Sequence, residues 1–499
     1  MEILSNLAQG FEVALTWQNL LFCFVGVTIG TFVGVLPGIG ALATISLALP
    51  LTFHLDTTAA LIMLSGIFYG AQYGSSTASI LLNLPGTATA IVTCLDGYPM
   101  AQKGRAGVAL FVTAITSFVG GAVGIVLLMT AAPLIAEVAL EFGAPEYFTI
   151  MLLGLVAASS FSVGSPLKGY AMMLIGIAIG LVGIDVNSGQ MRFIFGNYSF
   201  AEGLGLVAVA MGVFGVAELL ASIGGKTAAK PTRHISFRSM LPTRSDVKRS
   251  VLPTGRGSLI GFLIGALPGA GPSIAAFLAY AAETRATRPP EGFGSGAVEG
   301  IAAPEAANNA SVQSAFIPTL SLGIPGDAVM AVLLGALMIH GITPGPHFIS
   351  EEPDMFWGLA ASFWIGNLLL LVLNIPLIGI WVKILTIPYR ILYPVILMLV
   401  CFGVFSVRNN MMDVYIMLCA GVVGYVLRIF GFPAAPLLLG FILGPLMEEH
   451  FRRSLVIARG DMSVFIERPI SATLLALTLM ILAVPLLGGL RARWGRRSG

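Results

Sequence analysis

The chain has 499 residues, of which 57% are hydrophobic and only 10% are charged, and 60 of its residues are glycine. So few charged side chains cannot cover the surface of a water-soluble particle of this length, and the sequence therefore predicts an integral membrane protein. The net charge of +2 leaves no basic patch for nucleic acid, and glycine-rich apolar segments favour closely packed helices over a β-barrel.

The N-terminus has no basic region and no small-residue cleavage site, so we expect it to be retained chain and not a signal peptide. The four cysteines lie in apolar surroundings without CxxC spacing, which predicts buried packing and neither a disulfide nor a metal site.

The apolar segments fall into two halves, and a helix needs roughly 20 residues to cross a bilayer. The first half has segments near 16–52, 58–96, 108–139, 147–165, 169–186 and 201–223. The second half has segments near 257–282, 296–341, 356–386, 390–407, 411–430 and 434–447, and a last segment covers 470–490. We therefore divide the chain into a first transmembrane repeat (1–224), a linker (225–256), a second repeat (257–450), and an external loop, last helix and basic cytoplasmic tail (451–499).

The linker is basic, because residues 226–256 have eight Lys or Arg against the single acidic Asp246. Loops of this kind stay on the cytoplasmic side of the membrane.

The two halves resemble one another in detail. Pro37 of "LPGIG" in the first half corresponds to Pro268 of "LPGAG" in the second, and "NLPG" at 83–86 corresponds to "GIPG" at 323–326. The sequence "FSV" at 161–163 recurs at 405–407. The order is preserved while the offset drifts slowly. Three matches in the same order around unusual Pro-Gly breaks indicate a duplication.

Charges decide how the two copies are oriented. If each "LPG" segment were a full crossing, the copies would be parallel, whereas a re-entrant hairpin makes them inverted. The inverted arrangement places "QKGRAG" (102–107) inside and its counterpart "SEEPDM" (350–355) outside, and it puts the C-terminal "RARWGRR" inside. It also places "EFGAPE" (141–146) outside and the counterpart bounded by Lys383 and Arg390 inside. Arg192 and Arg408 are exceptions, but the balance favours inversion, with a periplasmic N-terminus and a cytoplasmic C-terminus.

The predicted fold is thus an all-α integral membrane protein with two inverted-topology repeats, each with a re-entrant hairpin and a Pro-Gly-broken transmembrane helix, plus one extra C-terminal helix. Glycine and proline supply the turn that a hairpin needs at mid-membrane, provided that its backbone is buried or lines a wet cavity. The expected tips and breaks are Pro37, Gly38, Gly40, Pro268, Gly269 and Gly271, and Asn83, Pro85, Gly86, Thr87, Gly323, Pro325 and Gly326.

Broken helices expose N–H groups that attract anions and carbonyl groups that coordinate small cations. Hydroxyl and amide residues cluster beside the breaks. We predict that they form the substrate site together with the tip and break residues named above; they are Ser75, Ser76, Thr77, Asn308, Asn309 and Ser311. Interhelical hydrogen bonding is the alternative role for each of them.

Two acidic residues, Glu305 and Asp327, lie in the second broken segment, where each is a candidate to hold a sodium ion or carry a proton, unless it lies near a membrane surface. The predicted cation set is Asn83, Thr87, Asn309 and Asp327. No Lys or Arg lies near either tip or break along the sequence, so an anionic substrate would have to be met by helix N-termini, neutral donors and co-bound cations.

The long stretches "GTFVGVLPGIGALATISLALPLTF", "YGAQYGSSTASILLNLPGTATAIVTCLDGYPMAQKGRAGVAL" and "EGIAAPEAANNASVQSAFIPTLSLGIPGDAVMAVLLGALMIHGITPGP" resemble the large membrane subunit of the tripartite tricarboxylate transporters. The resemblance covers essentially the full chain. It implies a bacterial inner-membrane permease that works with a small membrane subunit and a periplasmic solute-binding protein. It also implies import of di- or tricarboxylates such as citrate, driven by an ion gradient, commonly sodium, with no other cofactor.

Two other classes are weighed against transport. A channel for small solutes needs a continuous polar path, whereas the polar residues here gather at two breaks. An intramembrane enzyme needs a nucleophile and base or a metal set, and no HExxH or GxSxG pattern occurs.

Overall fold

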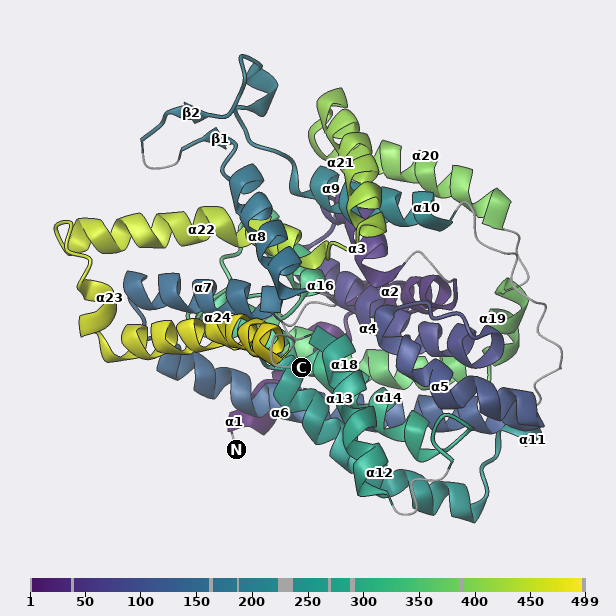
Figure 1. Ribbon diagram of the computed structural model, residues 1–499. Helices are drawn as coiled ribbons and strands as arrows, with labels where there is room; N and C mark the ends of the chain where they lie inside the picture. Colours follow the sequence, from purple (N-terminus) through teal and green to yellow (C-terminus); the bar gives the residue numbers. More distant parts are fainter. Residues whose placement is uncertain are drawn as a thin grey trace.

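The computed structural model describes residues 2–36, 40–160, 165–185, 188–222, 237–267, 271–287, 292–385 and 389–495. Over these residues the chain is almost entirely helical, with one short antiparallel pair of strands (Figure 1). Among the described helices, four apolar stretches are long enough to cross a membrane: Trp17–Val35, Ala88–Ala139, Pro353–Asn374 and Met411–Ile429. The protein is therefore an all-α membrane protein, as the composition predicts.

The elements of the first half are α1 (Glu2–Ala14), α2 (Trp17–Val35), α3 (Gly40–Thr52), α4 (Thr57–Leu82), the 3₁₀ turn η1 (Ala88–Ala90), α5 (Ile91–Met100), the π-helical turn η2 (Ala101–Arg105), α6 (Ala106–Ala139), α7 (Ala144–Ser160), α8 (Pro166–Gly180), β1 (Gly183–Ile184), β2 (Met191–Arg192), the 3₁₀ turn η3 (Tyr198–Phe200), α9 (Leu206–Ala210), the π-helical turn η4 (Met211–Val216) and α10 (Ala217–Ser222).

The elements of the second half are α11 (Phe237–Met240), α12 (Arg244–Gly265), α13 (Gly271–Ala286), α14 (Glu299–Ser314), α15 (Phe316–Leu322), α16 (Ala328–Ile339), α17 (Phe348–Glu351), α18 (Pro353–Asn374), α19 (Ile378–Ile384), α20 (Tyr389–Arg408), α21 (Met411–Ile429), α22 (Ala435–Ile457), α23 (Val464–Glu467) and α24 (Pro469–Gly495). Helix α12 begins at Arg244, inside the range expected to be linker.

Two helix pairs pack in the same register in the two halves. Glycines 26, 30 and 34 of α2 face the backbone of residues 63, 67 and 71 of α4. Glycines 257, 261 and 265 of α12 face residues 303, 307 and 311 of α14 in the same way. Each glycine of α2 is separated from its counterpart in α12 by the same number of residues as Pro37 is from Pro268. Each partner residue of α4 is separated from its counterpart in α14 by the same number of residues as "NLPG" is from "GIPG". Because glycine has no Cβ, the backbones approach closely, as membrane helices without a hydrophobic driving force require.

The backbone breaks also match. Helix α4 ends at Asn83 and α15 ends at Gly323, both in the left-handed conformation with φ of 56° and 69°. After each break the chain folds back on its own helix, so that Gly86 lies against Ser75, and its counterpart Gly326 lies against Ala315. Such a turn needs residues that tolerate positive φ, and glycine and asparagine are the common ones. The predicted breaks are confirmed as places where the helices end.

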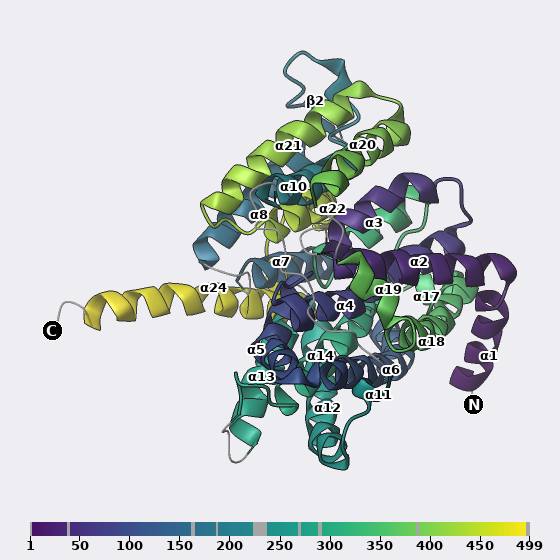
Figure 2. The same ribbon diagram turned by 90° about the vertical axis from the view of Figure 1, so that its right-hand side faces the viewer.

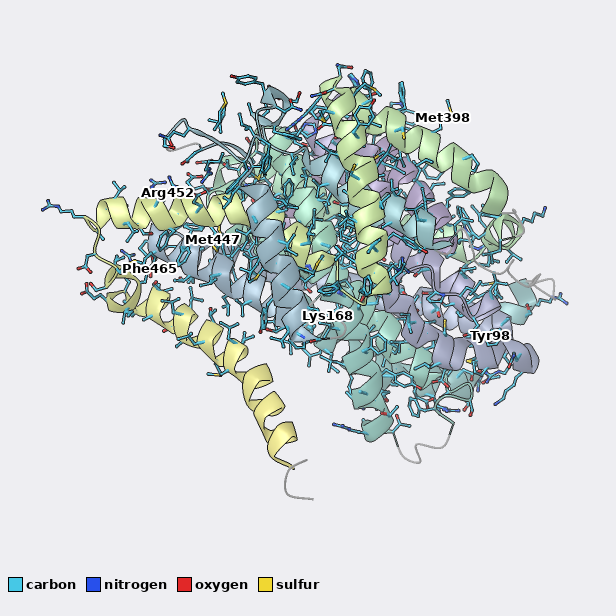
Figure 3. All side chains as sticks on the ribbon, turned by 45° about the horizontal axis from the view of Figure 1, so that its top comes forward. Tyr98, Lys168, Met398, Met447, Arg452 and Phe465 are labelled. Carbon is cyan, nitrogen blue, oxygen red and sulfur yellow. The ribbon has the colours of Figure 1, made fainter. Side chains whose placement is uncertain are left out.

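The remaining helices pair across the halves. Glycines 176 and 180 of α8 contact the backbone of α22, whereas Gly212 of η4 contacts α21. In the views of Figures 1 and 2, α20 and α21 cover one end of the molecule, and α12 and α13 lie at the other. Helix α24 packs on α7, and Figure 2 shows it extending from the body toward the C-terminus. Large apolar side chains remain exposed on these outer helices, such as Met398 of α20 (Figure 3), as expected of surfaces that meet lipid.

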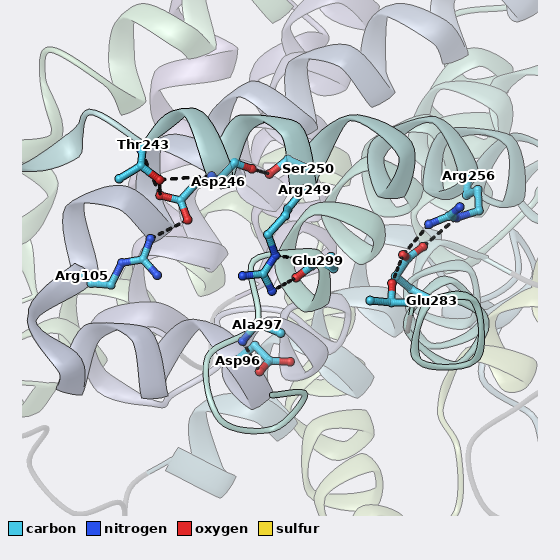
Figure 4. Close-up of polar contacts among 11 residues, drawn as sticks. Asp96, Arg105, Thr243, Asp246, Arg249, Ser250, Arg256, Glu283, Ala297 and Glu299 are labelled. Carbon is cyan, nitrogen blue, oxygen red and sulfur yellow. Dashed lines mark hydrogen bonds and ion pairs between the residues drawn. The ribbon is translucent and has the colours of Figure 1, made fainter. Parts of the chain in front are cut away.

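Arginine–carboxylate pairs join α12 to its neighbours (Figure 4). Arg249 of α12 holds Glu299 through two hydrogen bonds of 2.6 and 2.7 Å, and Arg256 holds Glu283 through two of 2.9 and 2.6 Å. Arg105 donates to Asp246 at 2.7 Å, and Asp246 also caps the start of α12 with Thr243. Burial acts to raise the pKa of Asp246, but the hydrogen bonds from Arg105 and Thr243 outweigh it, so that this pKa lies below its usual value of 3.8.

Candidate functional site

A cavity of about 450 Å³ lies between the two helix breaks and the first helical residues that follow the expected tips. Its wall contains Gly40 from the start of α3, Pro272 and Ser273 from the start of α13, and Thr87 and Asp327 from the two breaks. Four segments from both halves thus begin a helix at one space: α3, α13, η1 with α5, and α16. Backbone N–H groups at helix starts have no intrahelical partner, so this arrangement suits an anionic ligand.

The first helical residues require a conformation that glycine adopts. Gly40 has φ of +68°, and Gly271, its counterpart in the second half, has φ of +66°. A Cβ at Gly271 would lie 3.2 Å from the Cβ of Asp327, whereas nothing lies within 4 Å of a Cβ at Gly40. The other predicted tip residues, Pro37, Gly38, Pro268 and Gly269, lie outside the described residues.

The first break is held by a hydroxyl network around Gln72 of α4. The Oε1 atom of Gln72 accepts hydrogen bonds from Thr89 at 2.8 Å and Thr87 at 3.4 Å. Thr87 also bonds to Ser75 at 3.0 Å and to Thr89 at 2.7 Å. Of the predicted residues, Thr87, Pro85 and Gly86 line the cavity, and Ser75 supports it from behind. Thr89, a member of the hydroxyl cluster beside "NLPG", also lines this wall, and Gln72 completes it. The one sequence signal for Gln72 is its place in the same polar run.

The second break contributes Asp327 as the N-cap of α16. Its Oδ1 accepts a hydrogen bond of 2.8 Å from the backbone N–H of Met330. Thr87 stands at the corresponding N-cap of η1 but makes no capping hydrogen bond. Both residues therefore line the same cavity, but one carboxylate oxygen of Asp327 already accepts a capping hydrogen bond, whereas the hydroxyl of Thr87 does not cap its helix.

Several predicted residues lie elsewhere. Asn83 is exposed at the end of α4, and Thr77 is buried on α4 outside the cavity lining. Ser311 faces Gly265 of α12, and Asn309 donates a 3.0 Å hydrogen bond to the carbonyl of Glu305 within α14. The rest of the second-half set is buried without lining the cavity: Asn308 within α14, and Gly323, Pro325 and Gly326 at the break.

Among the described residues, one cationic residue lines the cavity, contrary to the expectation that no Lys or Arg lies near a tip or break. Arg428, in the last turn of α21, is among the lining residues. It is far from either break along the chain, so sequence proximity gave no signal. Helix α21 packs mainly on α9, η4, α10 and α20, so this charge comes from a separate packing unit.

Glu305 is fully buried within the protein, on α14. It accepts hydrogen bonds from Ser76 of α4 at 2.7 Å, from Thr93 of α5, and from Ser117 of α6 at 3.2 Å. The predicted site residue Ser76 thus belongs to this second polar centre and not to the cavity wall.

Comparisons with known proteins agree with the geometry. The profile described as "Tripartite tricarboxylate transporter TctA family" matches residues 20–439. A protein of Agrobacterium vitis described as "Uncharacterized 52.8 kDa protein in TAR-I ttuC' 3'region" is 50% identical over 496 residues, which cover 99% of this chain and 98% of that protein. A second, described as "Uncharacterized protein in TAR-II ttuC' 3'region" from the same organism, is 52% identical over 233 residues, covering 47% of this chain and 96% of that protein. No solved structure matches.

Proposed function

The chain belongs to the tripartite tricarboxylate transporter TctA family, and we propose that it is a secondary-transport permease that imports di- or tricarboxylates such as citrate through the cavity at its helix breaks. Family membership makes it a subunit of a tricarboxylate transporter and not an enzyme. The substrate, direction and driving force are the parts that we infer.

The observation that carries the proposal is the meeting of four helix starts and Arg428 around one cavity. Its volume of about 450 Å³ falls within the usual range for small-molecule sites, roughly 300–1,000 Å³. Unpaired N–H groups, threonine hydroxyls and one guanidinium are the donors that carboxylate groups take. The charge of a tricarboxylate exceeds that of one arginine, which leaves room for co-bound cations.

We further propose that the two halves are inverted repeats with re-entrant hairpins formed by α2–α3 and α12–α13. The matched glycine registers, breaks and positive-φ helix starts support an internal duplication. Inversion rests on the loop charges and places the ion pairs of Figure 4 and the C-terminus on the cytoplasmic side of the inner membrane.

Coupling to a sodium gradient is proposed on two grounds. Asp327 and Thr87 place oxygen ligands at the cavity, and a bound cation offsets substrate charge. By family, the permease acts with a small membrane subunit and receives its substrate from a periplasmic binding protein.

Replacement of Arg428 tests the proposed site. In proteoliposomes with the partner proteins, Arg428→Gln should raise the carboxylate concentration for half-maximal uptake about tenfold or more, because a hydrogen bond to a charged group contributes about 1.5–3 kcal/mol. Arg285→Gln is the matched control, since Arg285 also lies in the last turn of its helix, α13, but not in the cavity wall. If both variants take up carboxylate equally well, the cavity is not the substrate site.

A further inference from the structure

The fully buried carboxylate of Glu305 differs from five other deeply buried carboxylates of this protein. Each of those has an arginine partner within 2.9 Å: Glu146, Asp185, Asp246, Glu283 and Glu299. Within the described part of the chain, no Lys, Arg or His forms an ion pair with Glu305. A buried charge without a partner is costly in a protein interior, so its surroundings need an explanation.

Among the described residues, the hydrogen-bond partners of the Glu305 carboxylate are all hydroxyl groups, and they come from three different helices. Its Oε1 meets Ser76 and Thr93, and its Oε2 meets Ser117. A hydroxyl differs from an N–H group in that it can turn its proton away and offer a lone pair to a cation. Together the carboxylate and the hydroxyls supply five oxygen atoms and no nitrogen, which is the ligand set that hard cations take.

Asp96 shows the contrast. It is also fully buried, but its Oδ1 accepts backbone N–H groups of Gly296 and Ala297, both at 2.8 Å, and its Oδ2 accepts the hydroxyl of Tyr280 at 2.9 Å. Backbone N–H groups cannot become cation ligands. Asp96 is therefore an anchor for the segment before α14, whereas Glu305 has partners that can exchange a hydrogen bond for a metal bond.

We propose that Glu305, Ser76, Thr93 and Ser117 form a binding site for a small monovalent cation, for which sodium is the probe. One carboxylate with neutral oxygens is balanced by a single positive charge, whereas divalent sites usually gather more carboxylates. This inference rests on the proposed coupling of transport to a cation, and it places a coupling ion behind the cavity wall in addition to the Asp327 side.

The site is connected to the cavity through α4. The Ser76 hydroxyl lies 3.4 Å from the carbonyl of Gln72, whose side chain holds Thr87 and Thr89 at the cavity wall. Thr93 lies on α5, one turn beyond η1 and the same wall. A cation that draws Ser76 and Thr93 toward Glu305 therefore fixes both elements that present the first break to the substrate, which gives a physical link between cation and carboxylate binding.

Binding of ²²Na⁺ to the purified chain, with choline replacing unlabelled sodium at constant ionic strength, tests the site without any transport. The wild type should bind saturably, and Glu305→Gln should weaken binding at least tenfold. Ser117→Ala and Thr93→Val each remove one ligand with little change in volume and should weaken it several-fold. Glu299→Gln is the matched control, because it breaks an arginine pair at the start of the same helix and should bind as the wild type does.

Two results would overturn the inference: wild-type affinity in Glu305→Gln and Ser117→Ala, or no saturable binding in the wild type. Loss of binding in Asp327→Asn with full binding in Glu305→Gln would place the ion at the cavity instead and count against it too. Carboxylate uptake measured in parallel under a sodium or a proton gradient keeps the proposed function separate. If carboxylate uptake persists although the protein binds no sodium, the Glu305 site is rejected while the proposed transport function still holds.

Discussion

Gly261 allows α12 to pack closely on α14, so its replacement by alanine should change the free energy of unfolding in a predictable direction and by a predictable amount. In Gly261→Ala, the new Cβ would lie 2.6 Å from the Cα of Ala307 and 2.8 Å from its carbonyl carbon. Carbon atoms pack at about 3.5 Å or more, so the two helices would have to separate by roughly 1 Å. Overpacking of this kind lowers the free energy of unfolding by about 1–3 kcal/mol.

Gly255, on the same helix, is the matched control. It is exposed, and nothing lies within 4 Å of a Cβ built there, so Gly255→Ala should raise the free energy of unfolding by about 0.5–1 kcal/mol through helix propensity alone. The two variants should thus differ by roughly 1.5–4 kcal/mol with opposite signs. Gly30→Ala, the corresponding change in the first half, should behave like Gly261→Ala, since its Cβ would lie 2.9 Å from the Cα of Ile67.

The assay is thermal unfolding of the detergent-purified protein, followed by tryptophan fluorescence and by loss of the monodisperse chromatographic peak. We expect Tm to fall for Gly261→Ala and Gly30→Ala and to hold or rise for Gly255→Ala. A Tm for Gly261→Ala equal to that of Gly255→Ala would refute the close packing on which the matched registers depend.

Three further predictions concern an ion pair, a helix cap and the orientation of the loops. Because the pKa of Asp246 is lower in the folded protein than in the unfolded chain, its contribution to stability is present above about pH 4 and is lost as pH falls through the folded value. Asp246→Asn should therefore lower Tm at pH 7, and the difference in Tm from the wild type should shrink as the pH is lowered below about 4. Asp327→Asn should raise the sodium concentration for half-maximal uptake far more than Thr87→Val; an unchanged sodium titration would leave Asp327 as the cap that its bond to the α16 backbone already makes it. In a variant without the native cysteines, an impermeant thiol reagent added outside the cell should label a cysteine at Glu352 and spare one at Lys103, and equal labelling would exclude inverted repeats.

The backbone of the site was predictable because its special conformations need special residues. A helix that stops in the left-handed region at Asn83 or Gly323, or starts from positive φ at Gly40 or Gly271, leaves a Pro-Gly signature that can be read from the sequence. The repeat of that signature at a nearly constant offset also predicted that both copies share one architecture.

The side chains that complete the site were less predictable, because direction on a helix is readable only when one face is polar. Helix α14 is buried all round, so nothing in "APEAANNAS" separates Glu305, which reaches α4 and α5, from Ser311, which faces α12. Arg428 enters from a helix far along the chain, and only tertiary packing brings it to the cavity.

Gly180 illustrates the same limit. In the sequence Gly180 lies in an apolar segment without a Pro-Gly break, which favours a milder effect on transport for a large substitution there than for one at the tips. In the structure its Cβ would lie 2.5 Å from the carbonyl oxygen of Phe441 on α22, so that position is itself a tight helix contact and is unsuitable as a neutral control. Gly379, with nothing within 4 Å of its Cβ, serves that purpose.

Uptake by the reconstituted system shows whether this chain is a gradient-driven carboxylate permease. The chain, its small membrane subunit and the binding protein are placed in proteoliposomes, and entry of labelled citrate and related di- and tricarboxylates is followed with and without an imposed sodium gradient. We expect saturable uptake of at least one carboxylate that requires the binding protein and the gradient and is weakened by Arg428→Gln. Uptake that grows linearly with concentration, or that runs equally well without a gradient, would contradict this expectation and indicate a channel.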